Sequence, residues 1–193
     1  MPNHFIFDQS NSNFFGKLVN TYAAPGVVAP PDNDATVNAR EFATTFTTSS
    51  SLGILGGSVI ASMQLTNPSG SGRSLYVSNM AGGVGVGLSL LSSFSGSLVV
   101  ARGGTIASPS TLTPVNTLFG SAAASVMTAR SSTSVISAGT NFLSFPLDPG
   151  MFSLGFGGGI IVPPNQSLSM TVSGALSVAG TLSCFINLTW WEA

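Results

Sequence analysis

The chain has 193 residues, which is enough for one domain with a sizeable hydrophobic core. Hydrophobic residues make up 44% of it, which excludes a disordered chain, whereas charged residues make up only 6%, against about 25% in an average soluble protein. The net charge of −1 creates no field that favours nucleic acid or an anionic membrane as a partner. Because so few charges give a monomer little protection against association, the composition favours a subunit covered by neighbouring copies. A monomer kept soluble by Ser, Thr and Asn alone is the alternative.

Residues 1–40 differ from the rest and are predicted to form an extended N-terminal arm, with the body spanning residues 41–193. The arm holds half of the chain's five basic, six acidic and one histidine residues, namely His4, Asp8, Lys17, Asp32, Asp34 and Arg40. Prolines cluster in residues 23–31. Because proline fixes φ and disfavours helix before it, this segment is expected to be extended.

The arm also carries apolar side chains that are costly to leave in water: Phe5, Ile6, Phe7, Phe14 and Phe15. We therefore expect the arm to dock, either on its own body or on a neighbouring subunit. The first residues lack the basic start and apolar run of a classical signal peptide. No run of about 18 apolar residues predicts a membrane-spanning helix, so no membrane partner is expected.

From residue 41 onward the apolar residues alternate with polar ones. Val59, Ala61, Met63 and Leu65 alternate with polar or outward positions, and the same period of two recurs to the end of the chain. This period is typical of strands with one face in a core. The candidate strands are residues 41–48, 59–66, 74–80, 84–92, 96–102, 141–147, 157–163, 167–173 and 181–190. Residues 117–130 are compatible with a short helix, a loop or a strand.

Turn-forming sequences lie between these candidate strands, at residues 67–72, 102–104, 148–150 and 163–166. Eight to ten short strands at such spacing predict an all-β fold, a jelly-roll-type antiparallel sandwich with an extended N-terminal arm. The outward faces of the strands carry Ser, Thr and Gly, and the body has no lysine. Natural sheets commonly protect their edges with charge. Edges without it are expected to be occupied, and strand addition by a neighbour's arm would occupy them.

Two stretches of the body, residues 65–77 and 160–172, each read as strand, tight turn and strand. They resemble jelly-roll subunits of the tumour-necrosis-factor-like and complement-type class, as used in bacterial spore appendages and phage particles. The resemblance implies a sandwich, often trimeric or polymeric, with no active site. It also implies a place on an extracellular surface appendage or in a virion.

No constellation of residues predicts catalysis, a cofactor or a metal, so we expect a non-enzymatic protein. His4 is the only histidine and lies near the chain end, where a catalytic triad would have to recruit it. The body's acids, Glu41, Asp148 and Glu192, are too sparse to suggest paired carboxylates. Residues 32–34, Asp-Asn-Asp, lack the glycine and glutamate that complete a calcium loop, so a solvated turn is expected there.

Three further features of the sequence are explained by structural roles and do not indicate a functional site. The lone Cys184 is expected to be a buried, inert thiol because it shares a face with apolar residues. The glycine-rich residues 82–87 lack the context of a dinucleotide loop, and we expect them to let two sheets or two subunits approach closely. The arginines are dispersed singly, so they form no basic cluster for nucleic acid.

The Trp190-Trp191 pair is placed on opposite faces of the last strand. Trp190 follows the core face, so Trp191 lies on the outer face, where aromatic residues often anchor interfaces. Stacking of Trp191 on a sugar is the alternative reading.

The sequence therefore predicts a structural protein that assembles with copies of itself into a fibre, an appendage or a virion-type particle, with other structural subunits as further candidate partners. The assembly would use sheet packing and exchange of the N-terminal arm. Two alternatives remain. One is a carbohydrate- or receptor-binding sandwich on a phage or cell surface. The other is a pore-forming β-protein, because Ser/Thr alternation also suits a strand that faces a lumen.

Overall fold

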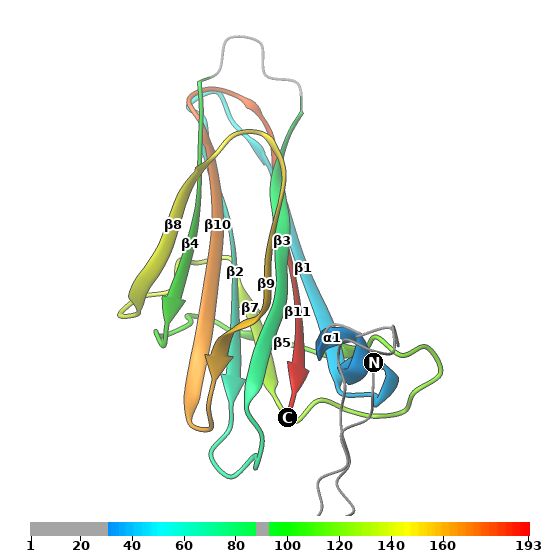
Figure 1. Cartoon of the computed structure of the whole chain (residues 1–193). Helices are drawn as coiled ribbons and strands as arrows, with labels where there is room; N and C mark the ends of the chain where they lie inside the picture. Colours follow the sequence, from blue (N-terminus) through cyan, green and yellow to red (C-terminus); the bar gives the residue numbers. More distant parts are fainter. Residues whose placement is uncertain (1–30, 88–92) are drawn as a thin grey trace, which may run out of the picture.

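The computed structural model describes residues 31–87 and 93–193, which form one short helix followed by strands (Figure 1). The elements are α1 (Pro31–Val37), β1 (Glu41–Leu52), β2 (Gly57–Asn67), β3 (Leu75–Gly87), β4 (Phe94–Arg102), β5 (Ser110–Leu112), β6 (Val115–Asn116), β7 (Thr128–Ser132), β8 (Thr140–Leu147), β9 (Gly150–Val162), β10 (Gln166–Leu176) and β11 (Gly180–Glu192). No helix in this part of the chain has the length and apolar character needed to cross a membrane.

The strands form two antiparallel sheets that pack face to face. One sheet has the order β6-β1-β11-β3-β9 and the other β5-β7-β2-β10-β4-β8. Consecutive long strands lie in different sheets, except β4 and β8, which are neighbours in the six-stranded sheet. The tight turn after β2 and the turn after β9 therefore each carry the chain from one sheet to the other. The predicted all-β antiparallel sandwich is therefore confirmed.

The core lies between the sheets and follows the predicted alternation. Met63 and Leu65 of β2 point inward, as do Leu182 and Trp190 of β11. Phe42 of β1 pairs with Trp190 in register, and their ring centroids are 6.2 Å apart. Large apolar side chains from every long central strand thus meet in one cluster, which supplies most of the driving force for folding.

The structure corrects several predicted strand bounds. The candidates at residues 74–80 and 84–92 are one strand, β3, up to Gly87, and residues 88–92 lie outside the described residues. Strand β9 begins at Gly150 rather than at residue 157. Most of residues 117–130 is loop, and β7 begins only at Thr128. Glycines misled the strand prediction, because both β3 and β9 continue through glycine-rich segments.

The end of the predicted arm is helical rather than extended, so the arm prediction is wrong for Pro31–Val37. A proline in the first turn needs no amide partner, and Asp32 and Asp34 there favour the helix N-terminus. The helix closes with hydrogen bonds from Ala39 N to Thr36 O and from Arg40 N to Ala35 O. These two bonds, with Ala39 at φ 56°, form a Schellman motif. The predicted solvated turn at residues 32–34 is therefore the first turn of α1.

Helix α1 packs against β1, β11 and β9, at the end of the sandwich where the chain's C-terminus lies (Figure 1). Ala35 is buried in this contact. The helix thereby covers part of the outer face of the five-stranded sheet, and the chain that precedes Pro31 leaves from this end of the body. Residues 1–30, which make up most of the predicted arm, lie outside the described residues.

Candidate functional site

The predicted interface residues fall into two groups. Phe5, Ile6, Phe7, Phe14 and Phe15 of the arm lie outside the described residues, as does His4. Trp191 lies on β11 and faces away from the core, as predicted. Its role in an interface stays a prediction.

Trp191 packs against its own chain. It pairs with Tyr76 of β3, and the two rings stack with centroids 3.9 Å apart and an interplanar angle of 4°. A bulge in β9 places Gly158 next to the indole ring of Trp191. A Cβ atom added to Gly158 would lie 3.1 Å from this ring. The indole Nε1 is buried and has no hydrogen-bond partner among the described residues. Trp191 is thus half-buried between Tyr76 and Gly158, and a larger residue than glycine at position 158 would crowd the indole ring.

The outer face of the six-stranded sheet is a ladder of paired hydroxyl and amide groups. Ser62 and Thr171 hydroxyls lie 2.9 Å apart, and those of Ser97 and Ser173 lie 2.8 Å apart. Opposite-charge pairs are absent from this ladder, and neutral hydrogen bonds between strands take their place. This part of the face is uncharged, as expected, whereas Arg130 on β7 places one exposed charge on the same face.

Part of that face is covered by the chain itself. Gln64 donates through Nε2 to Gly104 O at 2.9 Å, and Ser169 donates to Gly103 O at 2.6 Å. The loop after β4 therefore lies over β2 and β10, and both polar side chains are buried. The surface available for packing between subunits is smaller than the sequence pattern indicated.

One side of the sandwich ends in two unprotected edges. Strand β8 is the last strand of the six-stranded sheet and β9 the last of the five-stranded sheet. Neither strand contains a charged residue, and Asp148 lies in the turn between them. Pro146 limits pairing along β8, but no proline interrupts the 13 residues of β9. A bulge at residues 156–159 divides this edge, so residues 150–155 and 160–162 are the segments to which another strand can pair.

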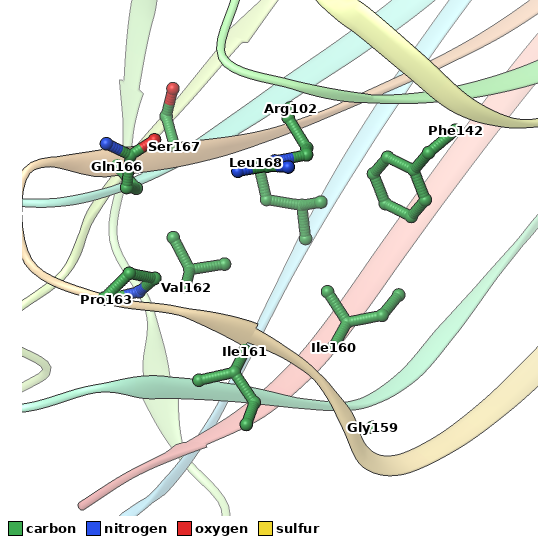
Figure 2. A pocket seen from close by; sticks show the side chains of 10 residues that line it. All are labelled: Arg102, Phe142, Gly159, Ile160, Ile161, Val162, Pro163, Gln166, Ser167 and Leu168. Atoms are coloured by element: carbon green, nitrogen blue, oxygen red, sulfur yellow. The ribbon is translucent and has the colours of Figure 1, made fainter.

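A groove runs between the two sheets at this side, with a volume of about 580 Å³ (Figure 2). Its apolar lining comes from both sheets: Phe142 and Leu168 from the six-stranded sheet, and Ile160 and Val162 from the five-stranded sheet. Arg102 lies at the rim, directly opposite Leu168 in the register of β4 and β10. The groove thus combines apolar walls with a single cation.

Sequence reasoning missed Arg102, although the signal was present. Leu98 and Val100 are buried on the inner face of β4, and Arg102 continues their period of two. The side chain is nevertheless exposed, because Arg102 is the last residue of the strand and its charge reaches solvent at the rim of the groove.

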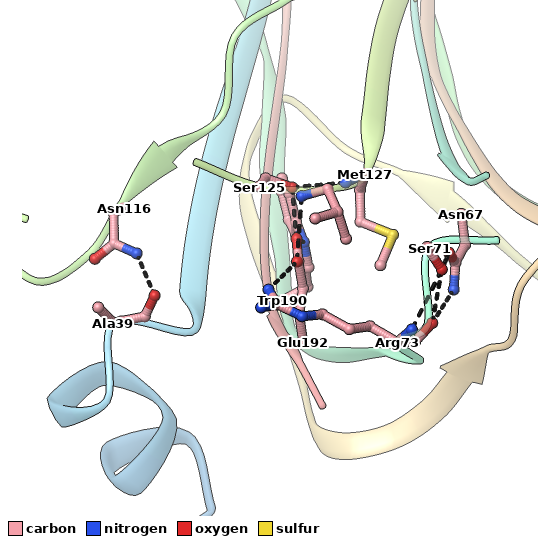
Figure 3. A network of polar contacts seen from close by, with 10 residues as sticks. Ala39, Asn67, Ser71, Arg73, Asn116, Ser125, Met127, Trp190 and Glu192 are labelled. Carbon is pink, nitrogen blue, oxygen red and sulfur yellow. Dashed lines mark hydrogen bonds and ion pairs between the residues drawn. The ribbon is translucent and has the colours of Figure 1, made fainter. Parts of the chain in front are cut away.

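Glu192 is a second missed residue, and it continues the inward face of Trp190. Its carboxylate is fully buried and accepts four hydrogen bonds (Figure 3). Oε1 accepts from Ser125 Oγ at 2.5 Å and Trp190 Nε1 at 3.3 Å; Oε2 accepts from Arg73 Nη1 and Val126 N, each at 3.3 Å. The carboxylate ties the end of β11 to the β2–β3 turn and to the loop before β7, so its role is structural.

Asn67 completes this network at the β2–β3 turn. Its Nδ2 donates to Arg73 O at 2.8 Å and to Val162 O at 2.9 Å, and its Oδ1 accepts from Ser71 at 2.6 Å (Figure 3). The side chain is fully buried. It holds the turn in the segment at residues 65–77 and joins it to the end of β9, which forms one wall of the groove.

The structure also locates the glycine-rich segment and shows how the residues able to bind a metal are distributed. Residues 82–87 belong to strand β3. An added Cβ would lie 2.2 Å from Phe185 O at Gly82 and 2.3 Å from Gly150 O at Gly83. The close approach is therefore between neighbouring strands of one sheet, which corrects the expected approach of two sheets or subunits. No group of three or more His, Cys, Asp or Glu residues lies together in the part of the chain that the structure describes.

Cys184 is fully buried, as predicted, and its thiol donates to Val59 O at 3.4 Å. Burial raises the pKa of this thiol from 9.0 to about 11. The unfolded chain loses the thiol proton near its ordinary pKa, whereas the folded chain keeps it. Folding stability should therefore fall as the pH rises from about 9 towards 11.

We expect urea unfolding of the wild type to show this loss between pH 8 and pH 10.5. The matched control is Cys184→Ala, which lacks the titrating group and should lose less stability over the same range. An equal loss in both proteins would contradict the assignment.

Comparisons with protein-family models, with curated proteins and with solved structures gave no match. The function is therefore argued from the geometry described above.

Proposed function

We propose that this protein is a non-enzymatic structural subunit that assembles with copies of itself into a fibre, an appendage or a virion-type particle. The observation that carries the proposal is the pair of uncharged edge strands, β8 and β9, on one side of the sandwich. A long unprotected edge leads to association unless something covers it. In a subunit, a neighbouring copy covers it in a defined way.

Exposed apolar side chains at these edges support the proposal. Met151 is 89% exposed and Ile161 is 55% exposed, and Phe142 and Phe145 of β8 are also partly exposed. They are spread along both strands, and other strongly exposed apolar side chains, Ile54, Leu55 and Phe119, lie elsewhere on the body. The low charge of the whole chain agrees with a surface that is largely covered.

We further propose that the sandwich is a jelly roll. Its eight long strands support this: β1-β11-β3-β9 face β2-β10-β4-β8, and consecutive long strands lie in different sheets except for the neighbours β4 and β8. A double-sheet roll of eight strands is a common architecture for shell and appendage subunits. The proposed place of such a subunit is an extracellular surface or a virus particle.

The arm supplies the second part of the proposed mechanism. Helix α1 fixes the start of the described chain at one end of the sandwich, and thirty residues precede it. Their aromatic side chains would be covered by docking on a neighbouring subunit. This exchange would link subunits more firmly than face-to-face packing alone, since each subunit both gives and receives a segment.

Salt dependence tests the nature of the contacts. Assembly through apolar and hydrogen-bonded surfaces should persist at about 1 M NaCl, where the Debye length is only about 3 Å. Light scattering of the purified protein from 0.05 to 1 M NaCl would follow the assembled mass. Dissociation at high salt would show an electrostatic interface and contradict the proposed one.

A further inference from the structure

We propose that the groove between β8 and β9 is the acceptor of the arm, and that it binds residues 5–8 of a second copy, with Asp8 paired to Arg102. This inference rests on the proposed function, because it names the partner surface for the exchanged arm. It is argued from the chemistry of the groove, from the unpaired charge at its rim and from the sequence of the segment.

The two walls of the groove differ. Ile160 and Val162 of β9 are two residues apart, so both point inward from the five-stranded sheet. Leu168 and Arg102 face them from the six-stranded sheet and lie directly opposite each other on β10 and β4 (Figure 2). One wall is therefore wholly apolar, and the other pairs an apolar residue with a cation. A strand that fits this groove needs apolar side chains on one face, and an apolar and an acidic side chain on the other.

Arg102 has no acidic partner of its own. Within residues 31–87 and 93–193, the single ion pair joins Arg73 to Glu192. The Arg102 side chain is exposed at the rim of the groove, where a guanidinium can form a bidentate, charge-assisted pair with an incoming carboxylate. In the arm, one acid directly follows an aromatic run, and this is Asp8 after residues 5–7.

Residues 5–8, Phe-Ile-Phe-Asp, have the required pattern. In an extended conformation Phe5 and Phe7 share one face, while Ile6 and Asp8 share the other. Phe5 and Phe7 would lie against the Ile160 and Val162 wall, which leaves Ile6 for Leu168 and Asp8 for Arg102. Asp8 is the one acidic residue among the first thirty, so no other part of that segment offers the same match.

The length of chain is sufficient for a second copy to be the donor. Residue 8 is separated from α1 by 22 residues, which span up to about 70 Å when extended. The longest strands of the body have 13 residues, or about 43 Å. The segment can thus reach past its own sandwich to the next one.

Charge exchange in the full-length chain tests the pairing. Asp8→Arg alone and Arg102→Asp alone each place like charges together, and each should raise the concentration needed for half-assembly at least about tenfold. The Asp8→Arg/Arg102→Asp double variant should assemble as the wild type does. The control is Arg130→Asp, which reverses an exposed charge on β7, separated from β8 by three strands, and should have no effect.

Mixing the two single variants identifies the donor. In an equimolar mixture, each arm meets a groove of opposite charge only on the other variant, so assembly should return. Restoration in the double variant without restoration in the mixture would show that the groove holds the segment of its own chain, and would overturn the exchange.

The remaining outcomes separate the two proposals. If both single variants assemble like the wild type while a chain without residues 1–22 stays monomeric, arm exchange stands and this groove is not the acceptor. If the wild type itself never assembles, the proposed function fails. Circular dichroism of each variant shows that it is folded, and Asp8→Arg changes no residue of the sandwich.

Discussion

Deletion of residues 1–22 should give a folded β-sandwich that no longer assembles. The deletion removes Phe5, Ile6, Phe7, Phe14 and Phe15, whose full burial contributes about 1.5–3 kcal/mol each before ordering costs. Association must overcome at least about 4 kcal/mol of lost freedom, so losing these contacts is enough to decide it. Helix α1 and every strand of the sandwich are retained. Circular dichroism and size-exclusion chromatography would measure folding and assembly separately.

Two controls sharpen this experiment. A full-length chain with Ser at the five apolar positions should behave like the deletion, whereas Ala at residues 11–13 should leave assembly intact. A lower melting temperature of the truncated monomer would show that the arm folds back on its own body. Truncated chains that form wild-type assemblies would leave face-to-face packing as the only mode of association.

Replacement of Glu192 by Ala should lower the free energy of unfolding by about 3–5 kcal/mol, the range for breaking a buried charged network. The substitution leaves the indole Nε1 of Trp190 and the amide of Val126 without acceptors, and Arg73 without its ion pair. Unsatisfied buried donors carry the full cost of desolvation. Total stabilities are about 5–15 kcal/mol, so the variant should be only marginally folded.

Urea unfolding followed by tryptophan fluorescence would measure this loss. Glu192→Gln keeps one acceptor oxygen and should lose less stability than the alanine variant. Asp148→Ala is the matched control: it removes an exposed carboxylate from the β8–β9 turn and should change the stability by no more than about 0.5 kcal/mol. A Glu192→Ala protein as stable as this control would show that the network contributes nothing.

The period of two carried most of what the sequence could predict about the fold. It placed the inward residues of β2, β10 and β11 correctly, because each strand has one buried face and period is a local property. It failed where glycine weakens the pattern: β3 was divided at residues 81–83, and the first half of β9 was missed. It also failed at α1, since seven residues are too few for a helical period to appear beside three prolines.

The candidate site was harder to predict, because it depends on which strands become neighbours. Arg102 and Leu168 are far apart in the sequence and meet only through the pairing of β4 with β10. The groove exists because β8 and β9 are the last strands of two different sheets. The alternation of β4 and β11 shows from the sequence that Arg102 and Glu192 continue the inward faces of these strands. The residues that surround them come from other strands and depend on the sheet topology.

Negative-stain electron microscopy of the purified full-length protein tests the central claim most directly. The account predicts regular fibres or closed particles, built from many 19.5 kDa chains and stable on dilution. A field of isolated 19.5 kDa monomers at every concentration, from a protein shown to be folded, would contradict it.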